Sequence, residues 1–227
     1  MPAMEPARRI LPRSPVADLC LTGLVALIVL DLALFQPLVG TGYVRRHWHE
    51  FFAALVIGLG VVAVWARMLG VLGVALALIR LANFWVPDST VRFWDAILYL
   101  AAVLILAFVV GRQVFGNPGR MNWHRVVGAV AIWLLAGLAF AQSYRLVAMH
   151  VPVAVLVQGA AADYDTIVAS LNYYSMVTLA TVGYGDIVPV HPIVRGFAVV
   201  EAVFGVMYPV VVISSLVSRE VSAGGNP

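Results

Sequence analysis

The sequence predicts an all-α integral membrane protein with six transmembrane helices and a short re-entrant helix that is followed by a loop. Two observations indicate this class. The 227-residue chain is 63% hydrophobic and only 11% charged, which is more apolar than a soluble domain that must cover its core with polar surface. Several apolar runs are also long enough to cross the hydrocarbon region of a bilayer at about 1.5 Å per residue.

The apolar runs place the spans along the chain. Residues 51–85 are too long for one comfortable span and carry Arg67 near the middle, so we interpret them as two short helices joined there by a tight turn. One long tilted helix over the same stretch is the alternative, and it would give five spans in total. The predicted spans lie at residues 16–39, 51–66, 69–85, 93–114, 126–149 and 192–218.

Arginine placement favours the count of six. Six spans put both termini on one side, with eight arginines on that side and six on the other, whereas five spans leave six inside and seven outside. Cytoplasmic loops are enriched in Arg and Lys, so the N-terminal segment 1–15 and the C-terminal tail 220–227 are predicted to be cytoplasmic. The net charge of +3 is explained by this topology, and we expect no nucleic-acid partner.

The stretch TLATVGYGD, residues 178–186, lies between the last two spans, where the chain is less apolar. Exposed irregular backbone is costly in lipid because its N–H and C=O groups lack partners, but it is tolerated where it lines a water-filled path. We therefore predict a half-buried helix over 164–178 that returns through an extended strand. Gly183 and Gly185 can adopt positive φ, which lets successive carbonyls turn toward one axis.

The order of these elements resembles the pore of potassium channels. A short amphipathic helix is followed by TVGYGD, then by IVP and a spanning helix, and the resemblance covers residues 125–219. Residues 16–115 resemble, more loosely, the front half of small bacterial six-helix potassium channels, and residues 116–125 are a linker with Asn-Pro-Gly at its centre. The resemblance implies a pore domain over 126–219, with outer helix 126–149, pore helix 164–178, filter 181–185 and inner helix 192–218.

The resemblance also implies the ligands and the assembly. In that family, four such loops form a filter whose backbone oxygens replace the water around K⁺. Here the corresponding ligands are the backbone oxygens of Thr181, Val182, Gly183 and Tyr184, together with the hydroxyl of Thr181. Gly185 is the last residue of the filter. The implied protein is a homotetramer in the lipid of the bacterial inner membrane, with K⁺ as the permeant ion and no cofactor.

Residues beside the filter match the family in part. Asp186 stands where relatives place a carboxylate at the outer mouth, and Tyr173 and Tyr174 stand where they often carry two tryptophans. These tyrosines are predicted to support the filter through Asp186 or Tyr184, although simple interface aromatics are the alternative. Two further positions depart from the family pattern: some relatives have a glutamate where this chain has Val177, and many have a threonine where it has Ala180.

The last span carries three notable residues. Glu201 is an intramembrane carboxylate, which is functional by default. We predict that it braces the back of the pore helix through Ser175 or Tyr173, with a gating role as the alternative. Gly205 matches the hinge glycine of the family, and Pro209 cannot donate a hydrogen bond to its carbonyl. A working hinge and a static bend are both compatible with this pair.

Other functions are less well supported. A voltage sensor requires a helix with arginine at every third position. The fourth predicted span, 93–114, carries only Arg112, near its end, so we expect no strong voltage gating. Ser175 and His191 would be the pair for an enzyme, but they lack an orienting third residue. His47 and His49 lack further metal ligands. A weakly selective cation channel and a non-conducting accessory subunit remain alternatives.

Overall fold

A computed structural model describes residues 15–35, 89–115, 123–162 and 164–224 of the chain. This part is mostly helical, and three of its helices are long and apolar enough to cross a membrane. The prediction of a mostly helical chain with membrane-spanning helices is confirmed for these three helices. The predicted spans 51–66 and 69–85 and the turn at Arg67 lie outside the described residues, so the choice between six and five spans stays a prediction.

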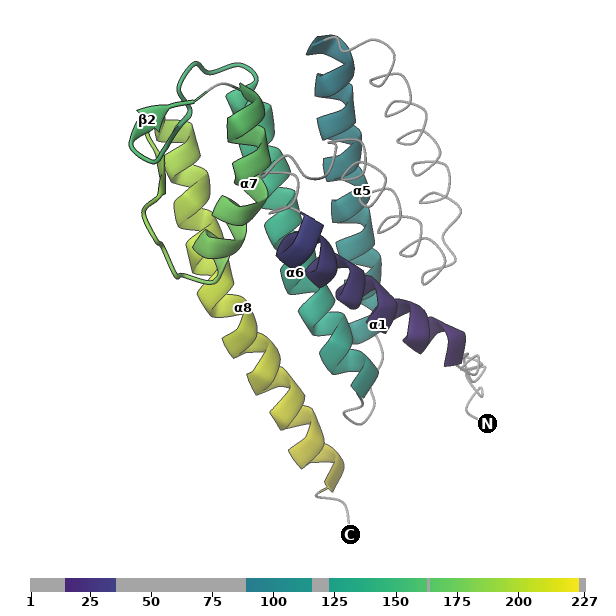
Figure 1. Cartoon of the computed structure of the whole chain (residues 1–227). Helices are drawn as coiled ribbons and strands as arrows, with labels where there is room; N and C mark the ends of the chain where they lie inside the picture. Colours follow the sequence, from purple (N-terminus) through teal and green to yellow (C-terminus); the bar gives the residue numbers. More distant parts are fainter. Residues whose placement is uncertain (1–14, 36–88, 116–122, 163, 225–227) are drawn as a thin grey trace, which may run out of the picture.

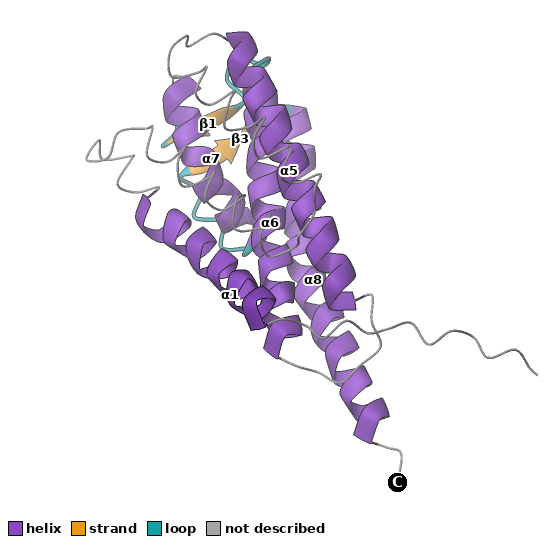
Figure 2. Ribbon diagram, turned by 90° about the vertical axis from the view of Figure 1, so that its right-hand side faces the viewer, coloured by secondary structure: helices purple, strands orange, loops and turns teal. Residues whose placement is uncertain are grey.

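The first predicted span, 16–39, is described over residues 16–35. Helix α1 (Pro15–Leu30) continues directly into a π-helical turn, η1 (Asp31–Phe35), and residues 36–39 lie outside the described part of the chain. It lies across α6 (Trp123–Ala148), as both ribbon views show (Figures 1 and 2). Leu21, Leu24 and Ile28 recur at helical spacing and are buried in this contact.

Helices α5 (Ser89–Phe115) and α6 form the main packed pair, and they include the predicted spans 93–114 and, except for its last residue, 126–149. Buried aliphatic residues of α5, such as Leu106 and Val110, pack against Leu135 and its neighbours on α6. Gly128 permits this close approach, because a Cβ atom there would lie 2.4 Å from a side-chain carbon of Val114.

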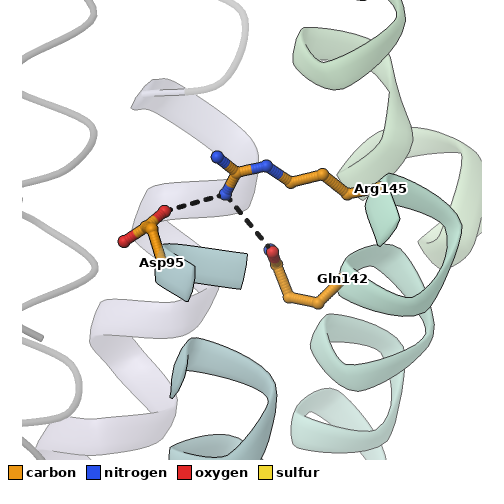
Figure 3. A network of polar contacts seen from close by, with 3 residues as sticks. All are labelled: Asp95, Gln142 and Arg145. Atoms are coloured by element: carbon orange, nitrogen blue, oxygen red, sulfur yellow. Dashed lines mark hydrogen bonds and ion pairs between the residues drawn. The ribbon is translucent and has the colours of Figure 1, made fainter. Parts of the chain in front are cut away.

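A buried ion pair also joins α5 to α6 (Figure 3). The Nη1 atom of Arg145 donates to Oδ2 of Asp95 at 3.0 Å and makes a longer contact of 3.5 Å with Oε1 of Gln142. The side chains of Arg145 and Asp95 are 13% and 6% exposed. Charges in so apolar a place are retained when they neutralise each other.

Helix α7 (Tyr164–Leu179) does not reach across the structure but ends against α6 and α8 (Pro192–Gly224). It extends one residue beyond the predicted pore helix. Helix α8 contains the predicted span 192–218 and continues past it, and Figure 1 shows α6 between α5 and α8. Pro192 is the first residue of α8, where a missing N–H leaves no helix bond unmade.

A small antiparallel sheet, which the sequence did not lead us to expect, caps the end of the molecule opposite the end of α8 (Figure 1). Its strands are β1 (Val155–Val157), β2 (Ala160–Ala161) and β3 (Ile187–Pro189), in the order β2-β1-β3. Gln158 and Gly159 connect β1 to β2 with φ of 51° and 77°, the backbone of a two-residue type I′ hairpin. The sheet therefore joins the segment before α7 to the segment just after residue 186.

We expect the Asp95–Arg145 pair to couple strongly in stability. Replacing Arg145 by Gln leaves the buried Asp95 without this cation and should destabilise the protein by about 3–5 kcal/mol, whereas the double variant R145Q/D95N should recover most of the loss. Thermal unfolding of the purified wild type, the two single variants and the double variant measures this coupling. Additive losses in the double variant would show that the two side chains do not act as a pair.

Candidate functional site

The candidate site begins where helix α7 ends. The N–H of Val182 donates to the carbonyl of Val177, and the N–H of Thr181 donates to that of Thr178, both at 2.9 Å. This pair of bonds is the Schellman arrangement, which satisfies the last carbonyls of a helix and needs a left-handed residue, usually glycine, just after it. Here that residue is Thr181, with φ of 58°. A β-branched residue rarely adopts this conformation.

The next residues have an alternating backbone. Gly183 and Gly185 have φ of 60° and 79°, so that together with Thr181 every second residue from 181 to 185 has positive φ. In an ordinary strand successive carbonyls point in opposite directions, whereas alternation in the sign of φ turns them toward the same side. The segment is also open to its surroundings: Val182 and Tyr184 are 50% and 70% exposed in the single chain. It can thus present a row of backbone oxygens away from the packed helices of the chain.

Polar and aromatic contacts surround the end of this segment that lies next to the sheet. The ring of Tyr173 stacks on that of Tyr184, with centroids 6.4 Å apart and planes 2° from parallel. A hydrogen bond with the Asp186 carboxylate raises the pKa of the Tyr173 hydroxyl above its usual range. The same carboxylate accepts from the N–H of Ile187 at 3.1 Å. Tyr174, by contrast, is buried with its ring edge-on to Tyr144 of α6, at a centroid distance of 5.1 Å.

The sheet holds the chain immediately after the site. Strand β3 pairs with β1, with Ile187 opposite Val157, and the N–H of Gln158 donates to the carbonyl of Asp186 at 2.6 Å. At the end of β3, the carbonyl of Pro189 accepts a hydrogen bond of 3.0 Å from Nε of Arg195 in the first turn of α8. The segment is therefore anchored at both ends, by the cap of α7 and by the sheet.

Gly205 has a packing role that its sequence position did not reveal. A Cβ atom at this position would lie 1.9 Å from the carbonyl oxygen of Leu179, the last residue of α7. The glycine therefore lets α8 touch the backbone at the end of α7, and a hinge role is not needed to explain it. Pro209 lies within the continuous helix α8, and the two residues remain a predicted hinge.

Glu201 connects three helices. It is 0% exposed, and the hydroxyl of Tyr144 on α6 donates to its Oε2 at 2.6 Å. Its Oε1 makes a very short contact with Oγ of Ser175 on α7, and this Oγ lies 2.7 Å from the carbonyl oxygen of Gly137 on α6. Ser175 was among the expected partners, whereas the expected alternative, Tyr173, lies at the end of the site next to the sheet.

Other candidate residues are not brought together. The ring of His191 accepts from the N–H of Ile193 at 3.3 Å, while Ser175 is buried against Glu201, so these two side chains do not form a nucleophile–base pair with each other. Groups of three or more His, Cys, Asp or Glu side chains that could bind a metal are absent from the described residues. His47 and His49 lie outside them.

The comparisons with known proteins agree with the class that this site suggests. Residues 129–221 match a protein-family model described as "Ion channel". The matched segment contains α7, the open backbone segment and nearly all of α8, and it supports an ion channel family and passive ion conduction. The searches of curated proteins and of solved structures found no match.

The contact at Gly205 gives a testable requirement for packing. Replacing Gly205 by Ala places a methyl group against the Leu179 backbone, which cannot move aside as a flexible side chain can, so α8 and α7 must separate. Such overpacking costs about 1–3 kcal/mol or more, and we expect lower thermal stability of the purified protein. Gly196→Ala is the matched control on the same helix, because nothing lies within 4 Å of the position that its methyl group would take. Equal stability of the two variants would exclude the packing role.

Proposed function

We propose that this protein is a potassium-selective channel that conducts K⁺ passively through a filter formed by residues 181–185. The observation that carries the proposal is the alternation of positive φ at Thr181, Gly183 and Gly185 in an open segment that directly follows a capped helix. The ion channel match over 129–221 includes this segment. No enzymatic step is needed, because conduction through a channel is passive.

The chemistry of the segment suits a permeant K⁺ ion. Its ligands would be the carbonyl oxygens of residues 181–184 and the hydroxyl of Thr181, which are neutral and replace water around the ion. Conduction requires binding that is favourable enough for entry and weak enough for exit. Neutral carbonyl dipoles meet both conditions better than a ring of carboxylates within the filter would. The carboxylate of Asp186 would lie at the outer mouth and attract cations to the entrance.

Several copies of the chain must meet to complete such a filter, and the exposed side of α8 supports a homotetramer. One loop covers only one side of an ion, whereas four identical loops can surround it. Apolar residues of α8 recur at spacings of three and four and are more than half exposed in the single chain, as expected of a face covered by another helix or by lipid. They are Val199, Val203, Val206, Val210 and Ile213.

The helix that precedes the proposed pore domain, α5, gives no support for voltage sensing. Helix α5 carries Arg92 in its first turn and Arg112 in its last turn, with no arginine between them. Because two arginines near the ends of the helix carry little charge through the membrane field, their movement would supply little energy for gating. We propose a location in the bacterial inner membrane, with both termini cytoplasmic and the filter at the extracytoplasmic side.

Flux measurements test the filter. The purified protein in liposomes should pass K⁺ much faster than Na⁺, and Gly183→Ala should abolish the selectivity or the flux, because a methyl group opposes a φ of 60°. Gly159→Ala is a matched control with φ of 77° in the hairpin turn outside the filter. Equal K⁺ and Na⁺ fluxes in the wild type would point to a weakly selective channel, and no flux to an accessory subunit.

The assembly is tested separately. We expect four copies of the chain around one axis when the protein is extracted in mild detergent or in native lipid, since the filter needs a closed ring of carbonyls. The mass of the intact complex, measured by native mass spectrometry, decides. A stable monomer or dimer that still conducts would contradict the proposed arrangement.

A further inference from the structure

The oxygens around Glu201 make more close contacts than the hydroxyl protons of Tyr144 and Ser175 can fill. Five oxygen atoms from four residues form a chain of three contacts: Gly137 carbonyl to Ser175 Oγ, Ser175 Oγ to Glu201 Oε1, and Glu201 Oε2 to Tyr144 hydroxyl. Each contact is as short as an O–H···O hydrogen bond, with 2.7 Å and 2.6 Å at the two ends of the chain. A proton is needed in each, since two oxygens without a proton between them repel at such a distance.

Two protons come from hydroxyl groups. Tyr144 supplies the one to Oε2, and Ser175 has a single proton for its two contacts. If Ser175 donates to Gly137, the contact with Oε1 needs a proton from Glu201. If Ser175 donates to Glu201 instead, its 2.7 Å contact with the Gly137 carbonyl has none. A protonated Glu201 is the one state that satisfies all three contacts.

The surroundings of Glu201 favour the same state. The side chain is completely buried, and its neighbours with ionisable or polar groups are Tyr144 on α6 and Ser175 and Tyr174 on α7. Among the described residues, no arginine or histidine makes an ion pair with it, and the ion pair between α5 and α6, Asp95 with Arg145, is separate. A buried carboxylate without a cation costs several kcal/mol, and the neutral acid avoids this cost.

We propose that Glu201 is a positioning residue that carries a proton at neutral pH, and that this proton fixes the helix before the filter between α6 and α8. Ser175 lies six residues before Thr181, in the helix whose end forms the filter cap. When Glu201 loses its proton, Ser175 can serve only one of its two acceptors, so α7 loses one hydrogen bond, either to Gly137 on α6 or to Glu201 on α8. Ion conduction then falls at alkaline pH. This last step rests on the proposed channel function, whereas the protonation does not.

Infrared spectroscopy tests the protonation without any need for conduction. The wild-type protein in lipid at neutral pH should show the C=O stretching band of a buried protonated carboxylic acid. Glu201→Gln should remove this band, while Asp95→Asn should leave it, because Asp95 is paired with Arg145 as a carboxylate. Labelling the wild type with ¹³C-glutamate should shift the band, which assigns it to glutamate even if Glu201→Gln does not fold. The absence of the band, or its insensitivity to both the variant and the label, would overturn the proposal.

Flux measurements then test the coupling. The K⁺ flux of the wild type should be lost reversibly over the same rise in pH that removes the band. Glu201→Gln keeps a donor and an acceptor at this position, so it should conduct and lose the pH dependence. A wild-type flux that stays constant while the band disappears would overturn the coupling. A band that follows Glu201 in a protein without K⁺ flux would contradict the channel function and the coupling but not the protonation.

Discussion

The described fold depends on one constraint: a backbone that leaves regular helix or sheet within the packed structure must still find partners for its polar groups. Helix α7 ends within the structure, and the N–H groups of Thr181 and Val182 close its last turn. On the other side, the chain re-enters regular pairing at β3, only two residues after Gly185. Residues 181–184 can thus present their carbonyls, while the cap of α7 and the sheet hold the segment at its two ends.

Thr181 shows what this arrangement costs. A left-handed conformation at a β-branched residue costs about 1–3 kcal/mol and persists when the surrounding structure enforces it. Glycine would fit the backbone without strain but has no hydroxyl. If the hydroxyl of Thr181 binds the permeant ion, as we propose, the strain is explained by function. The contacts of Gly205 with Leu179 and of Ser175 with Glu201 hold the helix that enforces it.

The sequence predicted the parts of this site that are local. The helix from Tyr164 and the need for positive φ at Gly183 and Gly185 follow from residue type and order alone. The sheet was missed because strands of two or three residues are too short to show periodicity. The packing of Gly205 and the bond from Tyr144 to Glu201 join residues on different helices, and a hydroxyl inside an apolar run gives little indication of its partner. Whether four or three spans precede the last two stays a prediction.

The ion pair between Asp95 and Arg145 affects whether the segment that matches the ion channel model, residues 129–221, can be separated from the rest of the chain. The family match begins at residue 129, which invites the view that α6 to α8 could be transplanted or expressed alone. A chain cut before α6 would keep Arg145 but lose its carboxylate, and it would uncover the aliphatic face around Leu135 that α5 buries. Helix α5 is therefore part of the smallest unit that can be moved intact between proteins, although the sequence match does not include it.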